Sequence, residues 1–266
     1  MTLPPIATRT DLFWSFGALL RRDVRVAQRE LPFFLLRVTL QPTLMVFIFG
    51  YLLPRMGFVQ GGYGGALLPG VLAMSITFAA IMGVALPMVA DFGVGGEIED
   101  RLLAPIPMQM VAAEKVVNGV VQGLIAALFL LPVARLIMGP IQALTIANFG
   151  LVIFLVLLGG ATFSAFGLWM GTAMSPQQIG VLFGIILTPL IFFGCTYYPW
   201  QGLSVLPVMK YLVLLNPLVY VSEGLRAALT PTLPHMPLWL VIGGLSLMTG
   251  TFWVLGMRTF RKRALT

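Results

Sequence analysis

Long apolar stretches without charge alternate with short polar segments along most of this chain. A helix needs about 20 mainly apolar residues to cross a bilayer, and six stretches reach or approach that length. The uncharged run 136–209 is too long for one helix, and turn-forming residues at 139–140 and 175–178 divide it. The predicted spans cover residues 38–54, 66–90, 116–138, 144–173, 178–198 and 238–257. We therefore expect an all-α membrane protein with six transmembrane helices.

Composition agrees with this pattern. The chain of 266 residues is 59% hydrophobic and 9% charged, with a mean hydropathy of +0.97, whereas soluble domains are about 25% charged. The first 14 residues lack the apolar core of a removable signal peptide, so we expect the first span to direct insertion. Cys195 is the single cysteine, which excludes an internal disulfide and a multi-thiolate zinc site. We expect no metal site.

The positive charges predict the orientation. Lysine and arginine gather on the cytoplasmic side of membrane proteins, and a cytoplasmic N-terminus places twelve of them inside and four outside. The inner set is Arg9, Arg21, Arg22, Arg25, Arg29, Arg37, Arg101, Lys115, Arg258, Arg261, Lys262 and Arg263, and the outer set is Arg55, Arg135, Lys210 and Arg226. Both termini are therefore expected in the cytoplasm. The net charge of +7 reflects topology, so we expect no nucleic-acid partner.

The segment before the first span has two faces. On a helical wheel, one arc holds only apolar side chains and the opposite arc holds arginines. The apolar arc is Leu12, Phe16, Leu19, Leu20 and Val24, and the basic arc is Arg21, Arg22, Arg25 and Arg29. We expect an amphipathic helix on the membrane surface, capped by Thr10 or Asp11 and closed by Pro32. It serves either as an anchor or as an elbow that also contacts a partner.

A second irregular segment, 199–237, precedes the last span. Its apolar pieces 203–215 and 217–229 are too short to cross a bilayer, and Asn216-Pro217 separates them. We expect two short helices that dip into the outer leaflet, where Glu223 and Arg226 lie one turn apart and can pair. The alternative is an interfacial cap without a mechanistic role.

The chain lacks the side chains and motifs that an energy-coupling site or an enzyme active site requires. The predicted spans hold no aspartate or glutamate, the single histidine is His235 in the outer segment, and no serine has a nearby base. Carboxylates that bind a coupling ion are therefore absent from the spans, and no phosphate-binding GxxxxGK[ST] loop occurs. We expect a protein that is not an enzyme, and energy for transport would come from another chain.

A cytoplasmic loop, 91–115, has the features of a docking segment for such a chain. It holds five of the nine acidic residues, against the positive-inside trend. Within EIEDRLLA, Ile98 and Leu102 share one helical face, and Glu97 and Arg101 form an i, i+4 pair on another. The segment predicts a short amphipathic peg that binds a partner. In a self-contained channel or carrier it would instead be a solvated loop.

Taken together, these features resemble the type-2 ABC exporter permeases. The resemblance rests on the basic N-terminal helix, the six spans, GEIEDRLLAPIPMQMVAAEK after the second span, and GCTYYPWQGL with NPLVYVSEGLRAAL before the last. It is strongest to the bacterial drug-resistance branch that includes the daunorubicin exporter permease. The segment 104–107, Ala-Pro-Ile-Pro, departs from the Thr-Pro or Ser-Pro expected there, which concerns docking more than family.

The resemblance implies an assembly and roles for individual residues. The permease would pair with a second copy or a paralogue in the bacterial cytoplasmic membrane, among lipids, and bind two ATP-binding subunits that carry ATP and magnesium; no cofactor would lie on this chain. Its layout would be a cytoplasmic segment 1–32, a transmembrane domain 33–257 and a basic tail 258–266. The implied partner contacts are Glu97, Ile98, Glu99, Arg101, Leu102, Arg21 and Arg25.

The implied path and gate are largely uncharged. The path residues are Gln41, Met45, Ser75, Phe78, Met82, Thr188, Phe192, Phe193, Tyr197 and Tyr198, and the outer gate is Asn216, Pro217, Glu223 and Arg226. Methionine adapts its shape and aromatic faces attract cations, which favours hydrophobic drugs or lipid-like compounds as substrates. Polysaccharide or glycolipid export is the alternative within the same family.

Overall fold

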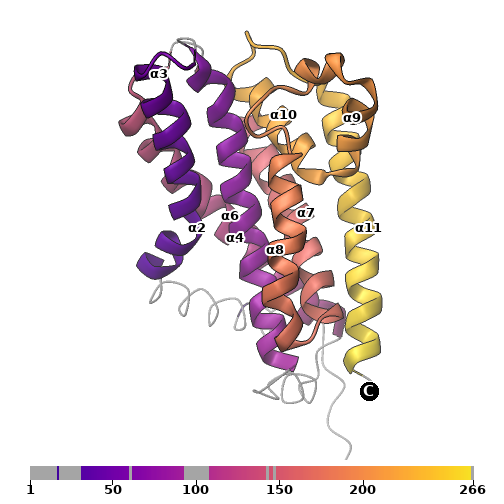
Figure 1. Cartoon of the computed structure of the whole chain (residues 1–266). Coiled ribbons are helices and arrows are strands. Elements are labelled where there is room, and N and C mark those ends of the chain that lie inside the picture. The colour runs from indigo at the N-terminus through magenta and orange to yellow at the C-terminus, as the bar shows by residue number, and fades with distance from the viewer. Residues whose placement is uncertain are drawn as a thin grey trace, which may run out of the picture.

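The structure is a computed structural model that describes residues 17, 31–59, 62–92, 108–141, 144–145 and 148–264. Regular structure in these ranges is helical throughout, so the all-α prediction is confirmed (Figure 1). The predicted N-terminal helix and the predicted docking peg lie outside the described residues.

The described helical elements follow one another in this order along the chain. They are α2 (Leu31–Met45), the π-helix η1 (Val46–Leu52), α3 (Leu53–Arg55), α4 (Tyr63–Phe92), α6 (Met108–Met138), α7 (Phe149–Ala173), α8 (Pro176–Phe192), the 3-10 helix η2 (Trp200–Val205), α9 (Pro207–Leu212), the 3-10 helix η3 (Val213–Leu215), α10 (Pro217–Leu229) and α11 (Leu238–Ala264).

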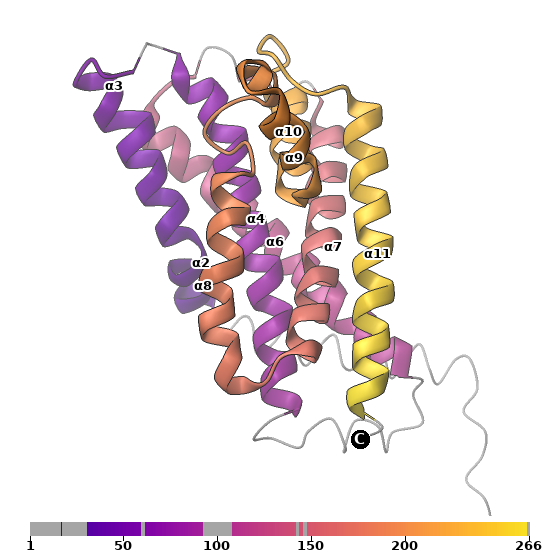
Figure 2. The same ribbon diagram turned by 45° about the vertical axis from the view of Figure 1, so that its right-hand side comes forward.

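Five of the described helical segments are long and apolar enough to cross a membrane. They are Leu31–Arg55, Tyr63–Phe92, Gln109–Met138, Phe149–Ala173 and Leu238–Ala264. Successive helices alternate in direction, and α8 runs beside them as a shorter sixth helix of 17 residues (Figures 1 and 2). The start of α2 and the end of α11 therefore lie at one end of the bundle, the C-terminal end. The hairpin α9–α10 lies at the other, the hairpin end.

Two turns between helices follow the sequence closely. The chain leaves α6 at Gly139, whose positive φ of 75° suits glycine because it has no Cβ. Ser175 and Gln178 form a capping box at the start of α8, and Pro176 occupies the first helical position. The two predicted breaks are thus confirmed.

Several helix ends differ from the prediction. The third span begins at Met108 rather than at 116, and the fifth ends at Phe192 rather than at 198. The second span also extends to Phe92 rather than ending at 90. Helix α4 therefore contains Asp91 and α6 contains Glu114, both buried, so the prediction that no acidic residue lies within a span is wrong. An apolar window stops at the first charge, whereas a helix continues when its charged side chains find partners in the fold.

Helix α4 lies at the centre of the bundle, where α2, α6, α7 and α10 pack against it. Glycines allow close approach there: a Cβ at Gly171 of α7 would lie 2.8 Å from the carbonyl oxygen of Ala85. Two hydroxyl pairs join α7 to α11, Thr162 with Thr249 at 2.7 Å and Thr172 with Thr259 at 2.5 Å. Lipid tails are as apolar as leucine, so close packing and hydrogen bonds hold this bundle together.

Candidate functional site

The predicted outer gate forms a helical hairpin at the hairpin end. The axes of the segments 207–215 and Pro217–Leu229 differ by 100°, and the break falls at Asn216 as predicted. The Asn216 side chain accepts a hydrogen bond from the Leu218 N–H and so caps α10. Its Nδ2 donates to the Leu190 carbonyl at 2.7 Å, which joins the bend to α8. All thirteen residues of α10 are buried.

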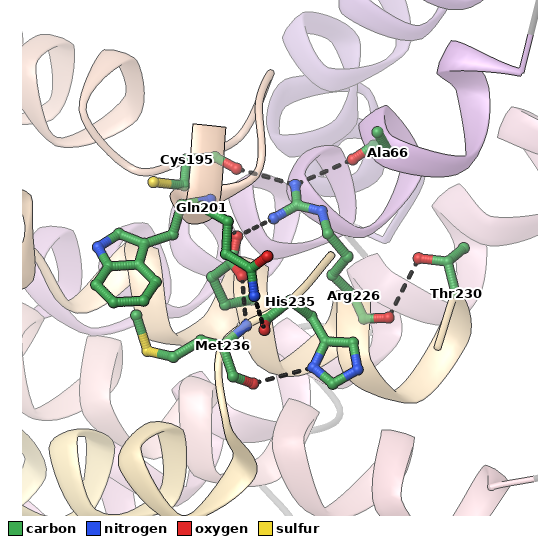
Figure 3. A network of polar contacts seen from close by, with 9 residues as sticks. Ala66, Cys195, Gln201, Arg226, Thr230, His235 and Met236 are labelled. Atoms are coloured by element: carbon green, nitrogen blue, oxygen red, sulfur yellow. Dashed lines mark hydrogen bonds and ion pairs between the residues drawn. The ribbon is translucent and has the colours of Figure 1, made fainter. Parts of the chain in front are cut away.

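A buried ion pair lies within this hairpin. Glu223 and Arg226 are both fully buried, and Arg226 Nη1 donates to Glu223 Oε1, so the predicted pairing is confirmed. Arg226 Nη2 donates to the carbonyl oxygens of Ala66 and Cys195, each at 3.0 Å. Figure 3 shows the guanidinium between these two carbonyls. Arg226 thus ties α10 to the start of α4 and to the loop after α8.

The carboxylate of the pair also has backbone partners. Glu223 Oε1 accepts from the Trp200 N–H at 2.8 Å, and Oε2 accepts from the Met236 N–H at 2.7 Å. We name Glu223 and Arg226, with the backbone groups of Ala66, Cys195, Trp200 and Met236, the outer clamp. A buried charge is tolerated only when it is paired and hydrogen-bonded. The outer clamp meets this condition with four backbone groups from separate segments.

The loop after α8 adopts an unusual conformation at Cys195. This residue has a positive φ of 52° and is fully buried. Burial raises the pKa of the Cys195 thiol to about 12, and the negative charge of Glu223 contributes a smaller part of this increase. A buried neutral thiol is inert at physiological pH. Cys195 contributes its carbonyl to the outer clamp, and its sulfur has no place in the predicted chemistry.

A second set of charges lies at the C-terminal end. Lys115 Nζ of α6 lies 3.7 Å from Asp91 Oδ2 of α4, and both side chains are nearly buried. Arg263 of α11 donates to the carbonyl oxygens of Gly171, Thr172 and Met174 at the end of α7. The Asp91–Lys115 pair joins the two helices that flank the predicted coupling loop, whereas the Arg263 contacts join α11 to α7. The predicted partner contacts Glu97, Ile98, Glu99, Arg101, Leu102, Arg21 and Arg25 lie outside the described residues.

The predicted path residues fall into two groups. On α2, α4 and α8, six of them reach the surface of the single chain and carry no charge: Gln41, Met45, Phe78, Met82, Thr188 and Phe192. Ser75 is fully buried in the middle of α4. It is therefore separated from the surface that the others reach.

The aromatic path residues near the end of α8 diverge. The rings of Phe192 and Tyr197 are 6.2 Å apart, and Tyr197 lies 5.4 Å from Phe49 of η1. Phe193 instead lines an apolar cavity with Phe166 of α7. Tyr198 donates its hydroxyl to the Phe192 carbonyl, which fixes the turn. The end of α8 thus presents aromatic rings in two directions.

Sequence reasoning missed the backbone half of the outer clamp. The side chains of Ala66, Cys195 and Met236 carry no sign that their backbone groups bind a buried ion pair. The available signal was the pair itself, because two opposite charges in an apolar segment need further partners. The Asp91–Lys115 pair had a similar signal, since the two charges flank one loop between two spans. Within the described ranges, no cluster of three or more metal-ligating side chains was found.

Comparison with known proteins gives two findings. The sequence profile of the ABC-2 type transporter family matches residues 15–230. The inner membrane transport permease YadH of Escherichia coli is 31% identical over 196 residues, which covers 69% of this chain and 70% of that protein. YadH of Shigella flexneri matches to the same extent. The family profile covers α2 through α10 and therefore includes Glu223 and Arg226.

Proposed function

This chain belongs to the ABC-2 type transporter family and is a membrane permease subunit of an ABC transporter, and on that premise we propose that it exports hydrophobic drugs or lipid-like compounds. Two separate ATP-binding subunits power the export, and a second copy or a paralogue of the permease completes the path. The observation that carries this proposal is that the predicted path residues Gln41, Met45, Phe78, Met82, Thr188 and Phe192 of α2, α4 and α8 reach the surface of the single chain and carry no charge.

The character of that surface supports an apolar substrate. Gln41 and Thr188 are the exposed polar members, and both are neutral. Three further members are half-buried: Met45 and Met82, whose side chains adapt in shape, and Phe78, which is aromatic. A charged or strongly hydrated molecule would lose its hydration here without gaining ionic partners from these residues.

The exposed face of α8 supports pairing with a second permease. Open space surrounds Gly180 and Gly184, which lie four residues apart on one face, whereas Gly119, Gly167 and Gly171 meet neighbouring helices of the same chain. Paired small residues let two helix backbones approach closely in a membrane. The α8 face therefore suits a helix from outside the chain.

The helix ends that flank the coupling loop support a link to ATP. The predicted docking residues lie in the loop between α4 and α6, and the Asp91–Lys115 pair joins these two helices next to the loop. A force applied to the loop by an ATP-binding subunit would therefore act on both helices together. One of them, α4, is the central helix of the bundle.

The first test is to replace the apolar docking face. We expect Leu102→Asp, alone or with Ile98→Asp, to abolish co-purification of the ATP-binding subunits and to abolish ATP-dependent efflux, because a charge would replace the proposed apolar docking face. The matched control is Leu206→Asp on the exposed hairpin loop, which should retain both. Unchanged efflux in a well-expressed double variant would reject the docking role. The absence of any ATP-binding subunit from the wild-type preparation would favour a self-contained channel or carrier.

A second test concerns orientation. A cysteine at Gln177, exposed at the C-terminal end, should react with an impermeant maleimide only from the cytoplasm, and one at Gln201 only from outside. The buried Cys195 should stay silent, so the native cysteine needs no removal. Labelling of the Gln177→Cys variant in intact cells would refute the predicted orientation.

A further inference from the structure

An apolar cavity of about 400 Å³ lies between α7, α8, the hairpin and α11. Phe166 of α7 and Phe252 of α11 lie edge to face at 4.9 Å on one side of it. Leu190 and Val213, both buried, form further walls. Phe193 lines this cavity, and the other predicted path residues do not.

The cavity lies at the depth of lipid chains. Phe252 is fourteen residues beyond the start of α11 at Leu238, which places it roughly 21 Å along the helix. With 27 residues, α11 is about 40 Å long, similar to a bilayer with its headgroup regions, so Phe252 lies near the middle of the bilayer. From there the cavity extends toward the hairpin bend at Asn216. The cavity therefore lies in the half of the membrane at the hairpin end.

The rim of the cavity is open and apolar. Phe193 is 45% exposed, Leu212 is 56% exposed and Leu215 is 77% exposed. Asn216 is the single polar residue among the eleven that line the cavity, and its amide already bonds to backbone groups of Leu190 and Leu218. A polar ligand would find few partners here, whereas an alkyl chain would bury its surface and complete the packing.

A lysine directly follows a residue that lines the cavity. Lys210 follows the cavity-lining Met209 on α9, and its Nζ lies 4.6 Å from the centroid of the Trp200 ring. In the described part of the chain, no carboxylate lies within ion-pair distance of Lys210. Tryptophan and lysine are typical of the interface between lipid chains and headgroups. An ammonium group at this place suits a lipid phosphate.

From these observations we propose that the cavity binds one acyl chain of a resident phospholipid from the leaflet at the hairpin end, with its phosphate near Lys210. The lipid fills the space between α8 and the rest of the chain. The proposal depends on the membrane location of the protein and is independent of which compound is exported.

The test uses the full-length permease in nanodiscs that contain phosphatidylglycerol with a photoreactive diazirine on its acyl chain. After illumination, peptide mass spectrometry should find the label concentrated at Phe193, Leu215 and Phe252. The Leu215→Trp variant fills the mouth of the cavity and should lose this label. Leu206→Trp is the matched control, because Leu206 is 58% exposed on the same hairpin but does not line the cavity.

The headgroup contact has its own readout. Lys210→Gln removes one positive charge near the membrane surface and should retain phosphatidylglycerol about fivefold less well through detergent washing. Equal retention would overturn the phosphate contact.

Three other outcomes would overturn the acyl-chain site. They are label spread evenly over the exposed faces of α8 and α11, label unchanged in Leu215→Trp, and cross-linking of these residues to a second copy. Loss of the label on addition of ATP to native membrane vesicles would identify transported cargo in place of a resident lipid. That last result would leave the proposed export function intact while rejecting this one.

Discussion

Helices α4 and α8 are both apolar and both carry predicted path residues, yet they are buried to very different extents within the single chain. Of the apolar window of α4, 78% is buried within the single chain. In contrast, α8 exposes Val181, Ile185 and Phe192, at 67%, 62% and 58%. Hydrophobicity cannot produce this difference in burial, because an apolar side chain is about equally stable in contact with lipid and in contact with protein. The contrast shows that close packing and buried polar contacts select which helix becomes central.

Small residues and hydrogen bonds account for the central place of α4. Gly119 of α6, and Gly167 and Gly171 of α7, let those helices approach its backbone. At its start, the Ala66 carbonyl accepts from Arg226, and near its end Asp91 pairs with Lys115. The corresponding glycines of α8, Gly180 and Gly184, have no such neighbours. An α8 with an open face is suited to meet a partner or lipid.

The largest expected effect comes from breaking the outer clamp. Arg226→Met leaves the Glu223 carboxylate buried without its counter-charge and should lower the free energy of unfolding by about 3–5 kcal/mol. Denaturant unfolding in detergent micelles measures this loss. Arg258→Met, at an exposed position on α11, is the matched control and should be nearly neutral. Equal stability of the two variants would show that Arg226 is dispensable for joining α10 to α4.

An intermediate effect is expected from adding a methyl group where α4 and the loop after α8 are in close backbone contact. A Cβ at Gly70 would overlap the backbone of Thr196, so Gly70→Ala should cost about 1–3 kcal/mol of unfolding free energy. Gly184→Ala meets open space within the single chain, so in monomeric protein, without the proposed second permease, it should be neutral or slightly stabilising, because alanine favours helix. The same unfolding assay compares them. A loss at Gly184 as large as that at Gly70 would mean that α8 is packed as tightly as α4.

The smallest expected effect concerns the hydroxyl pairs between α7 and α11. Thr172→Val removes the 2.5 Å hydrogen bond to Thr259 with little change in shape. The expected loss is about 0.6 kcal/mol, as for other hydrogen bonds between membrane helices. Thr251→Val is the control, since the Thr251 hydroxyl is exposed and bonds within its own helix to Leu247. A larger loss at Thr251 would contradict a role for the interhelical pair.

Much of the fold was predictable because local signals in this sequence agree with the tertiary structure. Gly139, Ser175 and Asn216 end or begin helices where they were expected to, since each has a conformational or capping preference of its own. The pair Glu223–Arg226 was predictable from its spacing. The start of α6 and the end of α8 were not, because they depend on neighbours that a window of sequence does not contain.

The sequence alone determined that this is an all-α membrane protein, where its helices break, and that Glu223 and Arg226 pair, since apolar length, turn residues and helical spacing act over a few residues. Only the tertiary structure decided that α4 is central, that α8 keeps an open face, and that four backbone groups from separate segments bind the buried ion pair. Those outcomes depend on close approach and hydrogen bonding between segments far apart in the chain. In a bilayer these forces, rather than hydrophobicity, distinguish one apolar helix from another.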